Sequence, residues 1–179
     1  ASIHAGVRDE VRGAAMHYLI TGKRPPAGDS VIPGVLPDTG IKVRPQPRET
    51  TAPITETLIE IAIAEERPDE VLRWYDRWEE GGVARYLKHN LEDRIADAVA
   101  GAYPERAFAI WKKRAERLIN EVRPQSYEVS LQYLRKLQSH MPPPEWEEYR
   151  DELRRKHARK KRFLEVLDRV EDRQIIKDI

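Results

Sequence analysis

The stretch Pro104–Val122, PERAFAIWKKRAERLINEV, decides the fold of this chain. Its apolar residues recur at steps of four, four, three and four, so they line one face of a helix; these residues are Ala107, Trp111, Ala115, Leu118 and Val122. Pro104 suits the first position of a helix, where a missing N–H group costs nothing, and Glu105 adds negative charge to the first turn. We therefore predict a helix that places Trp111 in the core of a helical hairpin.

A similar helix start recurs along the chain. It lies 36 residues before Pro104 at Pro68 and, in a looser copy, 40 residues after it at Pro144. When the first two prolines are aligned, apolar positions coincide: Val71 with Ala107, Leu72 with Phe108 and Tyr75 with Trp111. Helix starts that recur at such intervals are typical of stacked helical hairpins. The sequence therefore predicts an all-α fold of about seven helices in stacked antiparallel hairpins, a tetratricopeptide-like array.

We expect one domain over residues 1–179, which is an ordinary length for a single core. Its predicted parts are a first helix over 1–21, a loop over 22–53, helical hairpins over 54–144 and one long helix over 145–179. The last helix should project from the bundle in its middle, because Ala158 is the only apolar residue within 154–162. The chain starts with Ala1 instead of Met, so we also expect it to be a piece of a longer protein.

The loop over 22–53 differs from the rest in composition. It holds seven of the 13 prolines and four of the nine glycines, a density that neither a helix nor a central strand tolerates. It also carries apolar residues that a free linker does not need, namely Val31, Ile32, Val35, Leu36, Ile41 and Val43. We predict an ordered loop that wraps the helices, with a disordered segment and a binding loop as the alternatives.

Composition narrows the classes of function. Charged residues make up 35% of the chain, yet the formal net charge is only +1, so any case for a nucleic-acid partner must be local. The chain has no cysteine, which excludes disulfides and thiolate metal sites. No apolar run approaches the length of a membrane span, so we expect no membrane partner and a cytoplasmic location.

No catalytic constellation is recognisable in the sequence. The five histidines form none of the pairs that bind zinc on a helix, and no nucleophile elbow, Walker or dinucleotide-binding motif is present. The carboxylates sit beside Arg or Lys at helical spacing, as Asp151 does with Arg155, which is typical of a solvated helix face. We therefore predict a protein that is not an enzyme and needs neither a cofactor nor a metal.

One charged segment is distinctive. Residues 154–162 hold seven basic side chains, which are Arg154, Arg155, Lys156, Arg159, Lys160, Lys161 and Arg162. A helix with this charge could lie along a phosphate backbone or an anionic protein surface. The simpler interpretation is a solvated helix face, because four acidic residues lie just upstream at pairing distance: Glu147, Glu148, Asp151 and Glu152.

Several blocks resemble a known family. They are Val35–Gly40, Leu58–Glu65 leading to Asp69–Asp76, Pro104–Ala107 with Ile110 and Trp111, Tyr127–Arg135, and Glu145–Tyr149 through Arg154, His157, Lys160, Lys161 and Leu164. Together they resemble the C-terminal helical region of SWIM zinc finger proteins. The resemblance implies tetratricopeptide-type repeats that follow a cysteine-containing zinc module, which would lie upstream of this chain.

The resemblance also implies a role in interaction with protein or nucleic acid. We accordingly predict a non-catalytic helical-repeat scaffold whose partner is another protein. The alternative is a nucleic-acid-binding accessory module that uses the basic stretch 154–162.

Overall fold

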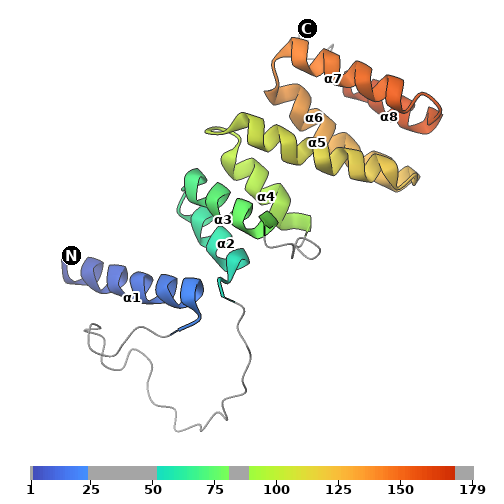
Figure 1. Ribbon diagram of the computed structural model, residues 1–179. Helices are drawn as coiled ribbons and strands as arrows, with labels where there is room; N and C mark the ends of the chain where they lie inside the picture. The colour runs from blue at the N-terminus through green and yellow to red at the C-terminus, as the bar shows by residue number, and fades with distance from the viewer. Residues whose placement is uncertain (1, 24–51, 81–88, 172–179) are drawn as a thin grey trace, which may run out of the picture. The chain divides into compact units, whose positions relative to one another are not determined.

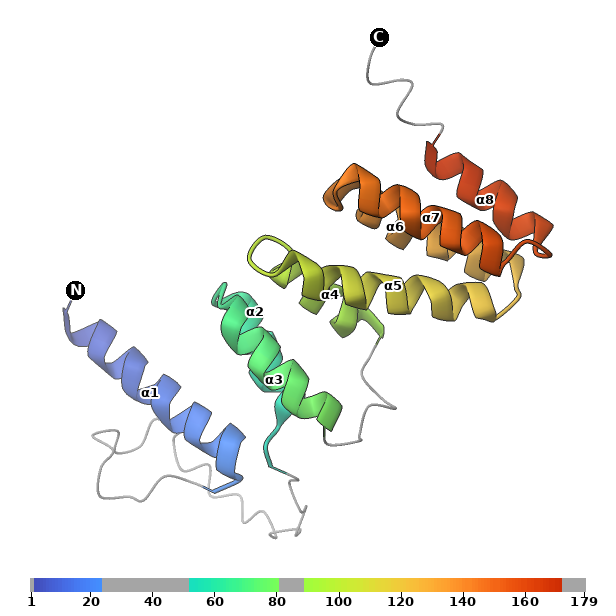
Figure 2. The same cartoon turned by 45° about the horizontal axis from the view of Figure 1, so that its top comes forward.

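The computed structural model describes residues 2–23, 52–80 and 89–171 (Figures 1 and 2). Every regular element in these ranges is an α-helix, so the all-α prediction is confirmed there, with eight helices described instead of about seven. The chain divides into two compact units, residues 1–86 and 87–179. The single domain over 1–179 and the tetratricopeptide-like stacking stay predictions. Most of the predicted wrapping loop, residues 24–51, lies outside the described part.

The first unit contains α1 (Ser2–Thr21), α2 (Thr55–Ala64) and α3 (Pro68–Glu80). The helices α2 and α3 pack against each other across the short connection 65–67. Their buried side chains are Leu58, Ile59, Ala62, Val71, Leu72, Trp74, Tyr75 and Trp78. The end of α1 is attached to the start of α2, because the Ile54 N–H donates to the Leu19 carbonyl over 2.8 Å.

The second unit contains α4 (His89–Val99), α5 (Pro104–Asn120), α6 (Pro124–His140), α7 (Pro143–Lys156) and α8 (Lys161–Glu171). The helix α5 packs between α4 and α6, and α6 in turn contacts both α7 and α8. Ion pairs join neighbouring helices at the surface, such as Arg169 of α8 with Glu128 of α6 at 2.6 Å. The core of this unit therefore lies along α5 and α6, with the other helices around them.

The stretch that opens the sequence analysis forms α5 as predicted, and Trp111 is 1% exposed in its core. Val122 was placed on the same buried face, and that prediction is wrong, because its side chain is 63% exposed. The helix ends at Asn120, and the chain turns through a positive φ of 55° at Val122, so this residue no longer follows the helical period. Ile119 is fully buried instead.

The predicted helix starts hold at the level of local structure. Pro68 and Pro104 are the first residues of α3 and α5, whereas α7 begins at Pro143, one residue before the predicted start at Pro144. All six positions that the proline alignment paired are buried: Val71, Leu72, Tyr75, Ala107, Phe108 and Trp111. Both helices thus bury side chains at the same positions, counted from their first proline.

The single long C-terminal helix over 145–179 is a wrong prediction. The chain leaves the helix after Lys156 and begins a new one at Lys161, so α7 and α8 are separate (Figure 2). The turn lets α8 fold back onto α6 and bury its own apolar face, which consists of Phe163, Val166, Leu167 and Val170. An unbroken helix would have carried these side chains away from the core, so their burial accounts for the break. Residues 172–179 lie outside the described part.

Candidate functional site

The basic stretch predicted from the sequence does not form one continuous helix, because a turn interrupts it. Arg154–Arg162 covers the end of α7, the connection 157–160 and the first two residues of α8; we call this segment the basic turn. The structure brings all seven predicted basic residues to one corner of the second unit. It gives them two different roles.

Three of the seven cations hold the basic turn in place. Lys156 Nζ lies 2.7 Å from Glu116 Oε2 of α5, and the pair raises the pKa of Lys156. Arg154 forms an ion pair with Asp168 of α8. Lys160 Nζ donates to the Ile119 carbonyl over 3.0 Å at the C-terminal end of α5, where the helix dipole favours a cation. These contacts join the turn to α5 and α8; the two ion pairs, of Lys156 and of Arg154, are exposed to solvent and each contributes on the order of 0–1 kcal/mol.

The other four cations are exposed on the basic turn: Arg155, Arg159, Lys161 and Arg162. Lys161 and Arg162 lie in the first turn of α8, which carries no acidic residue. Positive charge is unfavourable at that end of a helix, so these two residues do not serve the stability of α8.

The acidic residues expected to neutralise the stretch stay on the outer surface of α7. Asp151 pairs with its neighbour Arg150 at 3.0 Å. Glu148 and Asp151 also line an open hollow on α7 together with Arg154 and Arg155. The acidic neighbourhood therefore reaches Arg155 along α7, while Arg159, Lys161 and Arg162 lie beyond it in the chain.

A histidine lies buried inside the basic turn. His157 is 5% exposed, its ring packs edge-on against Phe163 with 5.4 Å between ring centroids, and its Nε2 has no hydrogen-bond partner. Burial lowers the pKa of His157, and the positive charges of Lys160 and Lys156 lower it further, whereas Glu116 opposes them. The neutral ring is thus the form that fits the folded turn.

This environment predicts a pH-dependent stability. The unfolded chain takes up a proton on His157 at a higher pH than the folded chain does, so the free energy of unfolding is greatest above the ordinary histidine pKa, about 6.5. It falls as the pH drops through 6.5 toward the lowered folded value. We expect the urea midpoint of the parent to decrease between about pH 7.5 and pH 5, as followed by circular dichroism.

The replacement His157→Gln should remove most of that decrease, because glutamine has no proton to gain. His17→Gln is the matched control, since His17 is exposed on α1, and it should keep the parental decrease. If H157Q and H17Q show the same pH profile, His157 does not govern it.

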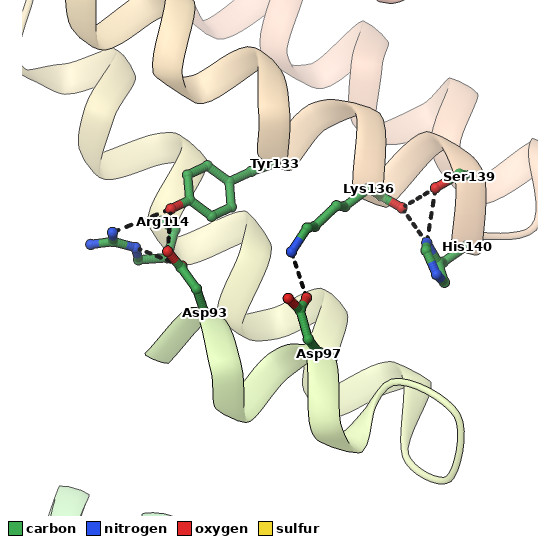
Figure 3. A network of polar contacts seen from close by, with 7 residues as sticks. All are labelled: Asp93, Asp97, Arg114, Tyr133, Lys136, Ser139 and His140. Atoms are coloured by element: carbon green, nitrogen blue, oxygen red, sulfur yellow. Dashed lines mark hydrogen bonds and ion pairs between the residues drawn. The ribbon is translucent and has the colours of Figure 1, made fainter. Parts of the chain in front are cut away.

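A buried polar network joins three helices of the second unit (Figure 3). Arg114 of α5 has a side chain only 8% exposed, and it lies 3.8 Å from Glu92 and 3.4 Å from Asp93, both on α4. It also donates to the Tyr133 hydroxyl of α6 over 3.3 Å, and that hydroxyl donates to Asp93 over 2.8 Å. These contacts pair the polar groups of the cluster with one another, so we assign the cluster a structural role.

The same network affects protonation. Burial by itself would lower the pKa of Arg114, but hydrogen bonding to Tyr133 and the charges of Asp93 and Glu92 raise it. The pKa of Tyr133 is raised, chiefly by burial. Arg114 therefore stays charged and Tyr133 stays neutral near neutral pH.

An apolar stripe on α1 remains in contact with solvent. Val11 is 40% exposed and Tyr18 is 38% exposed, and Ala15 between them is exposed as well. Among the α1 side chains that the structure describes, none is buried. The neighbouring face of α1 is only half-buried, and there Arg12 Nε donates to Glu65 Oε1 at the end of α2 over 2.6 Å.

The described ranges contain neither a candidate metal site nor a membrane-spanning helix. Among the residues of 2–23, 52–80 and 89–171, no three acidic or histidine side chains converge in a way that could hold a metal ion. None of the helices in these ranges combines the length and the hydrophobicity that crossing a bilayer requires.

Comparison with protein families, with curated proteins and with solved structures finds no match for this chain. The described residues form an all-helical fold, and the chain divides into two units. The resemblance to SWIM zinc finger proteins stays a prediction.

Proposed function

We propose that this chain is a non-catalytic helical interaction module, and that the apolar stripe of α1 is the surface with which it binds another protein. The exposure of Val11 and Tyr18 is the observation that carries the proposal. A cytoplasmic location and the absence of a catalytic role belong to the same proposal.

The spacing of the stripe supports a protein partner. Val11, Ala14, Ala15 and Tyr18 stand at positions i, i+3, i+4 and i+7 of α1. This is the pattern by which an amphipathic helix enters a groove on a partner or pairs with a second helix. Tyrosine is also enriched at the energetic centres of protein interfaces, because it combines a large apolar ring with a hydroxyl group.

The energetics of α1 support it as well. A lone helix gains little stability in water, and most of its stability in a protein comes from packing its apolar face. The contacts of α1 with α2 include the ion pair of Arg12 with Glu65, whose two side chains are 41% and 30% exposed. An ion pair so exposed to solvent contributes on the order of 0–1 kcal/mol. Burying the apolar stripe against a partner would therefore add stabilisation that this ion pair does not supply.

The test compares two variants with the same added charge. Val11→Asp with Tyr18→Asp places two carboxylates on the stripe. Gly13→Asp with His17→Asp places them on the opposite side of α1, where both residues are exposed and a new Cβ at Gly13 meets nothing within 4 Å. Each variant and the parent are immobilised as the full chain, and the proteins retained from a lysate of the source cell are identified by mass spectrometry.

We expect one or more proteins to be retained by the parent and by the Gly13/His17 variant but lost from the Val11/Tyr18 variant. Sedimentation velocity on the purified chains determines whether the retained protein is a second copy of this chain. Circular dichroism checks that α1 stays helical in both variants. An identical set of retained proteins on all three chains, or none on any, would contradict the proposal.

A further inference from the structure

We propose that the four exposed cations of the basic turn form a second binding surface, separate from α1, whose ligand is the phosphate backbone of a nucleic acid. Its residues are Arg155, Arg159, Lys161 and Arg162. The sequence suggested seven contacts along a straight helix, whereas the structure leaves four of them on a compact turn.

The surface is held in position before any ligand arrives. Lys156 is fixed to Glu116 of α5, and Lys160 to the end of α5 at Ile119. Arg159 lies between the two anchors, and Lys161 directly follows the second of them. Preorganisation of this kind lowers the entropy that binding must overcome.

The location of the charges favours an anionic ligand. Lys161 and Arg162 lie where the dipole of α8 disfavours cations. Their positive charge also adds to that of Lys160, whose pKa is lowered by burial and by Lys156. Phosphate groups in this corner would relieve the repulsion among like charges, and the fold places no acidic residue in the first turn of α8 to do so.

The surroundings favour nucleic acid over an acidic protein. A protein interface usually has an apolar or aromatic centre with charges at its rim. The large apolar side chain next to the basic turn, Phe163, is fully buried, and the exposed residues of the turn are the four cations, Ala158, and Lys156, which pairs with Glu116. Three of these cations are arginines, whose flat guanidinium groups match the oxygen atoms of a phosphate. The surface offers charge without an apolar anchor, which suits a uniform polyanion.

Fluorescence anisotropy with labelled duplex and single-stranded DNA of mixed sequence tests the proposal. With four phosphate contacts, the logarithm of the binding constant should fall against the logarithm of salt concentration with a slope of about −3 to −4. Sequence preference should be weak, because the contacts are to the backbone. Lys156 and Lys160 should not be replaced in this experiment, since their loss would disturb the turn itself.

The informative variant is Arg159→Gln with Arg162→Gln, two exposed residues with no role in fastening the turn. It should weaken binding on the order of a hundredfold at about 50 mM salt. It should also reduce the salt slope by about 2. The control, Lys23→Gln with Arg73→Gln, removes the same charge from exposed positions of the first unit and should bind like the parent.

Three results would overturn the proposal. One is a parent chain that binds neither DNA below about 100 μM at low salt, a concentration typical of the weakest nonspecific binding. Another is equal weakening by the two double variants, which would show that total charge matters and the basic turn does not. The third is displacement of the DNA by polyglutamate at an equal concentration of negative charges. It would assign the surface to acidic proteins.

Discussion

Replacing Trp111 with alanine should lower the free energy of unfolding by about 3–5 kcal/mol. Trp111 is 1% exposed, its ring centroid lies 6.2 Å from that of Phe108 and 5.3 Å from that of His140, and the ammonium group of Lys136 lies 5.4 Å from its centre. Alanine would leave a cavity between α5 and α6 that these side chains could only partly fill. Chemical denaturation followed by circular dichroism measures the loss.

Two controls make that measurement specific. The replacement Trp111→Phe should cost distinctly less, because it keeps most of the volume and removes an indole N–H that is buried without a hydrogen-bond partner. Val122→Ala, at an exposed position just beyond α5, should change stability by no more than about 0.5 kcal/mol. A Trp111→Ala chain that unfolds within a few tenths of a molar of the parent midpoint would show that this ring is not in the core.

Replacing Arg114 with leucine should have a similarly large effect, a loss of about 3–5 kcal/mol. The guanidinium group is the cation that Glu92 and Asp93 face, and the Glu92 side chain is only 9% exposed. Removing it leaves two carboxylates next to each other with less solvation than they have in water. The Tyr133 hydroxyl would also lose one of its two contacts.

The cause of that loss can be checked by neutralising the carboxylates. Adding Glu92→Gln and Asp93→Asn to the Arg114→Leu chain should restore much of the stability, because no unpaired charge then remains in the cluster. If Arg114→Leu alone is as stable as the parent in urea, or if the triple variant is no better than the single one, the cluster does not stabilise α4 against α5 and α6 through charge.

The elements that the sequence predicted well are those controlled by local signals. Pro68, Pro104 and Pro143 start helices because they lack an N–H that the first turn would leave unpaired. The apolar period around Trp111 fixes which face of α5 is buried. Both signals act within a few residues, so they can be recognised without knowledge of the partner helices.

The break between α7 and α8 follows from a difference in helical phase between the apolar residues before and after the basic turn. At about 100° per residue, Trp146, Tyr149 and Leu153 share one face. The centre of the second set, Phe163, Val166, Leu167 and Val170, is rotated from that face by roughly a quarter of a turn. One straight helix cannot bury both sets against the same neighbour. The charges of the segment obscured this, because acid followed by base at helical spacing is equally typical of an unbroken helix.

The candidate sites were only partly predictable, for a different reason. The sequence identified seven cations, but which of them pair internally depends on residues about 40 positions away, such as Glu116 for Lys156. Arg114 gave no signal in the sequence, because an arginine three positions after Trp111 could equally face solvent. The first helix was predicted, whereas the exposure of Val11 and Tyr18 on it could be learned only from the structure.

Four polar contacts of the second unit join a helix to the second helix after it, and these four share one property, their separation along the chain. Asp93 with Tyr133, Asp97 with Lys136, Glu116 with Lys156, and Glu128 with Arg169 are separated by 40, 39, 40 and 41 residues. Because the entropy of closing a loop depends on its length, each of these contacts costs nearly the same chain entropy to form. Loop length therefore favours none of these four contacts over the others, whereas contacts between consecutive helices, such as Arg114 with Tyr133 at 19 residues, close shorter loops.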